Sequence, residues 1–390
     1  MFIGRIEIEP ITKAYIMLCR RLFGCLFISI IICSCSKQLT VLQDSVKEEL
    51  LSQIASSYID DYDFSFLHIS DTHGSDYSLL YMETLLEETD ALFGIITGDI
   101  VMSDSMREII YSSSKPIYIL PGNHDVFDIY SENGQYRFRK EELDKSPWLS
   151  SMTFGDSNSN YYYVDFKDSD GVIRLICLDQ YEIDAVGPVP TYCSVISQKQ
   201  IDWLISVLED SGDCRSIIIA MHCGFGNSIY GSRDFGNKNS FISSTGGNPD
   251  SYEYLGSGDP RIVPDIIEAY KTGVNISNYY RSGYGNLMLK AETHFKTQSS
   301  NFTFYIGGHT HWDVVEYLSY HQNQLQSIIS SAYSRYPSLY DDVIREDKGI
   351  NAITINCNRI NTSKHLVQIV RLGARQCIDG TLRDYITFSY

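Results

Sequence analysis

Short runs of aspartate, asparagine and histidine recur along the sequence, each directly after an apolar stretch. The runs are Asp71-Thr72-His73, Gly98-Asp99, Gly122-Asn123-His124-Asp125, Met221-His222 and Gly307-Gly308-His309-Thr310-His311. Carboxylate, amide and imidazole groups without a thiolate among them suit borderline-hard divalent cations such as Mn, Fe, Zn or Ni. The neighbouring glycines permit tight turns and a close approach of the backbone. The pattern therefore predicts a metal site.

The elements that must position these runs can be predicted from the apolar stretches before them. Strands are predicted over 64–69, 93–97, 117–120, 161–166, 173–178, 217–220 and 302–306, with helices over 79–86 and 197–208. After His311 the pattern predicts further strands over 314–318, 325–332, 351–356, 365–371 and 385–389. In α/β sheets, ligands bind in the crevice at the carboxyl ends of the strands. We therefore expect one sheet edge to gather the polar runs.

The chain resembles the calcineurin-like metallophosphoesterase family over residues 64–313, because its runs follow that family's order of DxH, GD, GNHD, H and GHxH. The GNHD element alone should match by chance in well under ~1% of chains of this length. The resemblance implies an α/β fold, a four-layer α/β/β/α sandwich of two mixed β-sheets flanked by helices. It also implies hydrolysis of a small phosphomonoester or phosphodiester by two divalent metal ions and a bridging hydroxide.

The resemblance also implies a role for each residue of the runs. Asp71, His73 and His311 would hold the first metal ion, and Asn123, His222 and His309 would hold the second. Asp99 would bridge both ions. His124 would stabilise the transition state or protonate the leaving group, and Asp125 would orient His124 and keep it cationic near neutral pH.

The sequence does not identify the substrate, because the loops that would select it lie in a long segment between the ligand runs. Residues 224–300 are rich in Gly, Ser, Asn and Tyr and are interpreted as an insertion that carries loops over the site. Loops of this kind choose the substrate. The segment around Leu178-Asp179-Gln180, with Gln200 and Trp203 in the following helix, resembles the branch of cyclic-nucleotide phosphodiesterases and purple-acid-type phosphatases. A tyrosine at the purple-enzyme spacing after Asp99 is missing.

The formal net charge of −18 argues against binding of nucleic acid, because a phosphate backbone is bound by clustered Lys and Arg. A nuclease is therefore the less favoured enzyme. A small phosphorylated substrate remains compatible, since two bound cations would reverse the charge locally. The alternative from another class is an exported binding or structural protein that keeps the fold without turnover.

The first residues predict export. Arg20 and Arg21 precede the apolar run 22–32, which is short for a membrane span and typical of a secretory signal. The run is followed by Cys33-Ser34-Cys35, which resembles a bacterial lipoprotein cleavage site with Cys35 as the lipidated cysteine. We therefore expect a signal peptide over 1–35, a tethering helix within 36–62, and a periplasmic or cell-surface catalytic domain over 63–390. An uncleaved anchor helix is the alternative.

The remaining cysteines and histidines carry weaker signals. No CxxC pair is present, so the sequence indicates neither a zinc ribbon nor a redox motif. An oxidising compartment would allow disulfides among Cys177, Cys193, Cys214, Cys223, Cys357 and Cys377, whose pairing the spacing leaves open. His68 falls inside a predicted strand and is assigned to the core.

Overall fold

A computed structural model describes residues 44–57, 61–126, 140–182, 196–223, 262–281, 288–297, 299, 301–308, 316–320, 323–327, 353–373, 377–378, 381–382 and 385–390. Several predicted features lie outside these ranges. They are the export segment over 1–35, the ligands His309 and His311, and residues 224–261 of the predicted insertion.

The chain separates into two compact units, residues 1–51 and 52–390. Residues 44–56 are helical, within the range where an apolar stripe predicts a tethering helix. Within the described ranges, no helix has both the length and the apolar character that crossing a membrane requires. The second unit contains the two large sheets and every described residue of the predicted site.

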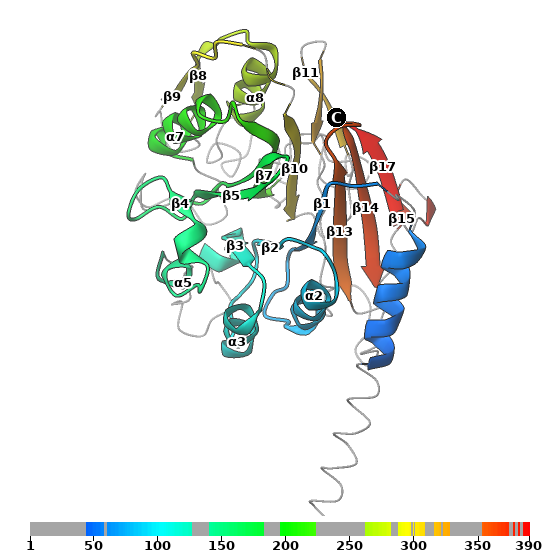
Figure 1. The fold of residues 1–390 in the computed structure, drawn as a ribbon. Coiled ribbons are helices and arrows are strands. Elements are labelled where there is room, and N and C mark those ends of the chain that lie inside the picture. The colour runs from blue at the N-terminus through cyan, green and yellow to red at the C-terminus, as the bar shows by residue number, and fades with distance from the viewer. Residues whose placement is uncertain are drawn as a thin grey trace, which may run out of the picture. The chain divides into compact units, whose positions relative to one another are not determined.

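Six strands form the first sheet, in the order β17-β14-β13-β1-β2-β3 (Figure 1). Strands β1, β2 and β3 are parallel, whereas β13, β14 and β17 extend the other side of β1 in antiparallel fashion. All residues of the parallel strands are buried, which explains their nearly continuous apolar sequences. The strands are β1 (Phe64–Ile69), β2 (Gly94–Thr97), β3 (Ile117–Leu120), β13 (Thr354–Asn361), β14 (Leu366–Gly373) and β17 (Tyr385–Ser389).

Five strands form the second sheet, in the order β10-β7-β6-β5-β4. Strands β10, β7 and β6 are parallel, and β5 and β4 continue the sheet in antiparallel fashion. The strands are β4 (Thr153–Phe154), β5 (Tyr162–Asp168), β6 (Gly171–Cys177), β7 (Cys214–Cys223) and β10 (Phe302–Gly308). Two-stranded pairs are formed by β8 (Ser277–Arg281) with β9 (Met288–Glu292), β11 (Glu316–Tyr320) with β12 (Asn323–Ser327), and β15 (Cys377–Ile378) with β16 (Thr381–Leu382).

Aromatic side chains join the two sheets. Phe66 of β1 stacks on Phe304 of β10 with ring centroids 6.3 Å apart. Phe93, just before β2, stacks on Phe166 of β5 at 4.5 Å. Such large side chains bury much apolar area, so this layer contributes strongly to stability.

Helices flank the sheets as the fold class predicts. Met82 and Leu86 of α2 (Tyr77–Glu88) lie against Gly94 of β2, with α3 (Asp104–Ser112) beside α2. Helices α7 (Gln198–Glu209) and α8 (Ile262–Thr272) pack with β7 in one apolar cluster. The two mixed sheets with flanking helices confirm the expected α/β architecture. Short helices complete the described elements: α4 (Asn123–Val126), α5 (Lys140–Asp144) and the 3-10 turn Leu149–Ser151.

The second part of the predicted insertion belongs to the core. Ile262, Val263, Ile266 and Ile267 of α8 are buried in the cluster with α7 and β7. The β8-β9 pair follows α8 directly. Residues 262–292 therefore include regular structure that packs against the second sheet, rather than only loops.

The assignment of His68 to the core is confirmed. His68 is fully buried inside β1, and Trp203 packs against the cluster of α7 and α8. Cys177, Cys214 and Cys357 are buried free thiols. These three cysteines therefore form none of the disulfides that the sequence allows.

Candidate metal centre

The parallel half of the first sheet brings predicted ligands to one edge. Asp71 follows β1, Asp99 follows β2, and Asn123 follows β3. Because these strands are parallel, their carboxyl ends meet at the same edge, as expected from the sequence. All three side chains are buried.

The loops after β1 and β2 contain left-handed backbone. The φ angles are 53° at Asp71, 45° at His73, 52° at Asp99 and 50° at Val101. This conformation is costly for residues that have a β-carbon, and it recurs at functional sites. The loops also bind each other through backbone hydrogen bonds from Asp71 N to Gly98 O (3.0 Å), His73 N to Asp99 O (2.9 Å) and Gly74 N to Ile100 O (2.8 Å).

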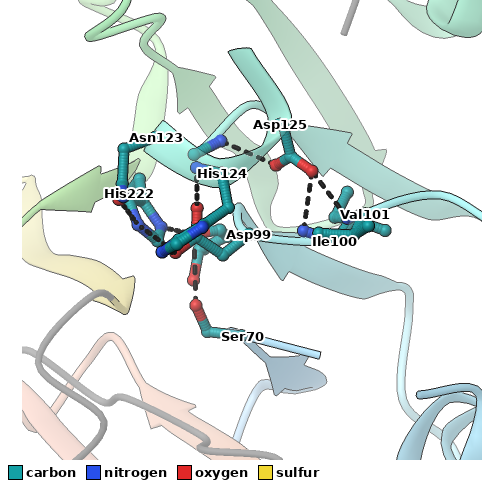
Figure 2. Close-up of polar contacts among 10 residues, drawn as sticks. Ser70, Asp99, Ile100, Val101, Asn123, His124, Asp125 and His222 are labelled. Carbon is teal, nitrogen blue, oxygen red and sulfur yellow. Dashed lines mark hydrogen bonds and ion pairs between the residues drawn. The ribbon is translucent and has the colours of Figure 1, made fainter. Parts of the chain in front are cut away.

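Asp99 lies at the centre of the site (Figure 2). Its side chain is 1% exposed, and Oδ1 accepts a hydrogen bond of 2.7 Å from the backbone N–H of His124. Its Oδ2 lies 3.3 Å from Nε2 of His222 and 4.0 Å from Nε2 of His124. A carboxylate between two imidazoles is well placed to bridge two cations.

His222 reaches the same point from the second sheet. It is fully buried near the end of β7. Its Nε2 lies 3.0 Å from Oδ1 of Asn123, and its Nδ1 lies 2.7 Å from the carbonyl oxygen of Thr97. The centre therefore joins the ends of strands from both sheets.

Glycines permit this close approach. A β-carbon would lie too close to a site atom at each of three positions: 2.5 Å from His222 Nδ1 on Gly98, 2.3 Å from Asp99 Oδ1 on Gly122, and 2.4 Å from Asp71 Oδ2 on Gly308. Gly98 also has a φ of 91°, which favours glycine. The glycines of the polar runs are thus required by the geometry of the centre.

Asp99 and His222 shift each other's pKa in opposite directions. Burial acts to raise the pKa of Asp99, but the charge and hydrogen bond of His222 outweigh burial and lower this pKa to about 2. Burial acts to lower the pKa of His222, but attraction to Asp99 and the hydrogen bond between them raise it to about 9. Nε2 of His222 therefore carries a proton at neutral pH, which it must release to ligate a metal.

His73 and His124 form the more exposed side of the centre. Their rings meet edge to face, with centroids 4.9 Å apart and planes at 78°. The side chain of His124 is 26% exposed, whereas those of Asp99 and His222 are buried. A molecule from solvent can therefore contact the centre beside His124.

Asp125 has different partners from those that the resemblance implied. Its Oδ1 accepts hydrogen bonds from the backbone N–H groups of Ile100 (2.9 Å) and Val101 (2.7 Å), and its Oδ2 accepts one from Gly122 N (2.8 Å) (Figure 2). Burial and the nearby Asp99 raise the pKa of Asp125 to about 7, although these three donors oppose the rise. The carboxylate thus joins the loop after β2 to the loop after β3, rather than contacting the imidazole of His124.

The donor atoms present fit divalent cations. Among the residues that the structure describes, two groups have ligand atoms within 4.8 Å of one another: Asp71, Asp99 and His222, which are buried, and His73, Asp99 and His124. Both groups share Asp99, as a bridging ligand would. Two buried carboxylates at one point also need positive charge, because an uncompensated buried charge is costly. Asp71 lies with His222 in the first group, whereas the resemblance implied different ions for these two residues.

The structure describes the surroundings of the remaining predicted ligands only in part. Gly308 of β10 contacts Asp71, while His309 and His311 lie outside the described residues. Sequence reasoning missed Thr97, whose carbonyl oxygen lies 2.7 Å from Nδ1 of His222, and Ser70, whose hydroxyl donates to that same oxygen at 3.2 Å. The one available signal was their place beside the polar runs.

Two mixed sheets whose strand ends converge on buried Asp and His residues define the architecture of a metallophosphoesterase. The sequence profile of the calcineurin-like phosphoesterase family matches residues 64–313, and the chain belongs to this family. Membership supports metal-dependent phosphoester hydrolysis in general terms. No curated protein matches the chain in sequence.

Solved structures with a similar fold share little sequence with the chain. A dimetal phosphatase from Danio rerio is 12% identical, with 85% of this chain and 100% of that chain covered and a TM-score of 0.48. A purple acid phosphatase from yellow lupin (Lupinus luteus) seeds is 14% identical, with 86% and 55% covered and a TM-score of 0.41. A putative 5′-nucleotidase from Staphylococcus aureus is 14% identical, with 84% and 54% covered and a TM-score of 0.39. The chain thus spans about half the length of the last two.

Proposed function

We propose that this chain hydrolyses a small phosphomonoester or phosphodiester at the centre around Asp99. The observation that carries this proposal is the buried Asp99 carboxylate, which both ligand groups share. When bound, two divalent ions would supply positive charge to the phosphoryl oxygens and acidify a water molecule between them. The identity of the metals is open among Mn, Fe, Zn and Ni.

The ligands set the charge of the loaded centre. Asp71 and Asp99 provide two carboxylates, while Asn123 provides a neutral oxygen beside Nε2 of His222. A third carboxylate in place of Asn123 would cancel more of the cations' charge. The amide therefore leaves net positive charge for binding a phosphate group.

His124 is the residue that we assign to proton transfer. Its backbone N–H is fixed by Asp99, while its imidazole lies on the exposed side next to His73. An imidazole in this place can stabilise charge on the phosphoryl group or donate a proton to the leaving oxygen. Asp125 supports His124 indirectly, because it fixes the turn from which His124 extends.

The charge of the chain supports a small substrate. With a formal net charge of −18, the protein repels a long polyanion, whereas the loaded metal centre would attract a single phosphate group locally. A nuclease is therefore the weaker alternative.

Hydrolysis can be tested on the purified full chain loaded with Mn. We expect cleavage of p-nitrophenyl phosphate or of its bis ester, and a panel of monoesters and diesters would then define the substrate class. His124→Ala and Asp99→Asn should each lower the rate by about 100-fold or more. His294→Ala is the matched control, because His294 is an exposed histidine outside the centre, and it should retain the wild-type rate. A protein that binds two metal ions but cleaves neither ester would instead be a binding protein.

We further propose that the chain is exported and attached to a membrane through a lipid on Cys35. The basic and apolar residues before Cys35 support this proposal. In a bacterial host supplied with a labelled fatty acid, the wild-type chain should take up the label and Cys35→Ser should not. Equal labelling of both proteins would contradict lipidation at Cys35.

A further inference from the structure

The carbonyl oxygen of Thr97 lies behind the metal centre and accepts two hydrogen bonds. Nδ1 of His222 donates one at 2.7 Å, and the hydroxyl of Ser70 donates the other at 3.2 Å (Figure 2). Thr97, Ser70 and His222 are all fully buried. Because a carbonyl oxygen has two lone pairs, both are occupied.

This contact decides which nitrogen of His222 faces the ligands. A carbonyl oxygen cannot donate, so Nδ1 must carry the proton that the two atoms share. Nε2 is then directed at Oδ1 of Asn123, 3.0 Å away, and at Oδ2 of Asp99, 3.3 Å away. The nitrogen that can lose its proton to a metal is therefore the one that points into the donor set.

The side chain of Thr97 is held in turn by a histidine outside the centre. Oγ1 of Thr97 and Nε2 of His68 are hydrogen-bonded at 2.8 Å, and both residues are fully buried. His68 is the next-to-last residue of β1 and lies opposite Ile95 of β2. The hydrogen bonds thus connect β1 to the end of β2, and the end of β2 to His222 on β7.

We propose that His68, Thr97 and Ser70 are positioning residues that hold His222 with Nε2 turned toward the metal position. This inference rests on the proposed metal-dependent function, and it adds a layer of residues that touch neither substrate nor metal. Outer partners of this kind fix the tautomer and the orientation of a ligand histidine, and their loss typically lowers metal affinity by about 10–100-fold.

Metal binding to the full chain tests the proposal without any measurement of turnover. Thr97→Val removes the hydroxyl that meets His68 at nearly constant volume, and zinc affinity is measured by calorimetry. We expect one of the two zinc ions to bind about 10–100-fold more weakly, with the other unchanged. Thr97→Ser keeps the hydroxyl and should restore the wild-type affinity.

Thr303→Val is the matched control. Thr303 is also buried and loses a hydrogen bond, to Ser216 at 2.6 Å, but it lies in β10 away from the ligands. Both zinc affinities should stay at their wild-type values. Wild-type affinity in Thr97→Val, or equally weak binding in Thr97→Ser, would overturn the proposal.

The tautomer of His222 gives a second test, which holds even if Thr97→Val does not fold. In the zinc-loaded wild-type protein, imidazole ¹⁵N NMR should show a proton on Nδ1 of His222 and zinc on Nε2. Zinc on Nδ1 would refute the inference. A protein that has the expected tautomer but cleaves no phosphoester would refute the proposed function and leave the positioning role intact.

Discussion

The two halves of the six-stranded sheet differ in where their backbone departs from regular geometry. Among the described residues other than glycine, positive φ angles occur at Asp71, His73, Asp99, Val101 and His365. All of these except His365 belong to the loops after β1 and β2, in the parallel half. The antiparallel half contains His365 alone, in the turn between β13 and β14.

Burial does not explain this difference, because β1 in the parallel half and β13 in the antiparallel half are both buried along their length. The residues with positive φ instead lie where the predicted metal ligands meet. Strained backbone of this kind lowers stability and is found mainly at functional sites. The loops of the parallel half are therefore less stable than they could be because they form the site, while the antiparallel half mainly supports the fold. Substitutions in the two halves should change different properties.

The largest effect is expected from Asp125→Ala. It leaves the N–H groups of Ile100, Val101 and Gly122 without their acceptor, and each buried orphan donor costs about 1–3 kcal/mol. The free energy of unfolding should fall by about 3 kcal/mol or more, and zinc affinity should fall with it. Asp125→Asn keeps one oxygen acceptor but turns an NH₂ group toward a donor, so its loss should be intermediate. Chemical denaturation measures both.

Asn361→Ala is the substitution in the antiparallel half that corresponds to Asp125→Ala, because it also removes a side-chain oxygen that accepts a hydrogen bond from the backbone. The Oδ1 of Asn361 accepts a 2.7 Å hydrogen bond from the backbone N–H of Lys364 in the turn after β13. Its removal should lower stability while zinc affinity stays unchanged. A loss of zinc affinity equal to that of Asp125→Ala would remove the distinction between the two halves.

Two glycines with similar backbone give the next test. Gly98 has a φ of 91° and Gly373 a φ of 87°, so alanine is strained at both. The β-carbon of Gly98→Ala would lie 2.5 Å from Nδ1 of His222, whereas that of Gly373→Ala would lie 2.1 Å from the carbonyl oxygen of Ile353. Both variants should be less stable, but only Gly98→Ala should lower zinc affinity, by about 10-fold or more. Calorimetry on the folded variants checks this, and equal affinities would contradict it.

A smaller effect on stability is expected from the protonation of His68 at low pH. Burial lowers the pKa of His68 to about 3, and the charge of Arg371 adds to this while Asp71 opposes it. An unfolded histidine titrates near 6.5. Between these two pKa values, His68 is protonated in the unfolded chain but not in the folded chain. The free energy of unfolding therefore falls as the pH drops from 6.5 toward 3. The contribution is at most about 1.4 kcal/mol per pH unit.

His68→Gln isolates this contribution. The variant should show a shallower fall in the free energy of unfolding between pH 6.5 and 4 than the wild type, both measured without metal. Identical slopes would mean that His68 does not resist protonation in the folded protein.

The smallest effect is expected just beyond the strained loop. Oγ of Ser103 caps α3 by accepting a hydrogen bond of 3.2 Å from Met106 N. Ser103→Ala should cost about 1 kcal/mol of stability in thermal unfolding. Zinc affinity should stay unchanged, which would mean that the residues that affect the site end at Val101 and do not include α3. A tenfold weaker affinity would extend the site into α3.

The sequence predicted the elements whose signals are local. The ranges expected for 64–69 and 117–120 are those of β1 and β3, because short apolar runs end there at polar residues. Helix α3 was missed although Met106, Ile109 and Ile110 stand at helical spacing, because a helix of 9 residues gives only a short stripe. Strand β8 was missed because its Ser, Asn and Tyr residues are also common in loops, and β9 was missed with it.

The sequence predicted the polar residues that the structure brings together around Asp99, because residue type and order suffice to recognise their runs. The contacts of Asp125 were not, since they depend on how the loops after β2 and β3 come together in space. The link from His68 through Thr97 to His222 depends on the register of β1 against β2 and on the approach of β7. Sequence spacing contains no information on contacts of this kind.

The place of β1 in its sheet has a consequence for the order of folding. Strand β1 lies between β2, which follows it closely in the chain, and β13, which pairs Ile360 with Phe64. Contacts between residues so distant in sequence form slowly, because the entropy of closing a long loop must be overcome first. During synthesis, the strand that leads to Asp71 therefore keeps one open edge until Thr354–Asn361 has been made. The candidate metal centre should gain its final rigidity among the last events of folding.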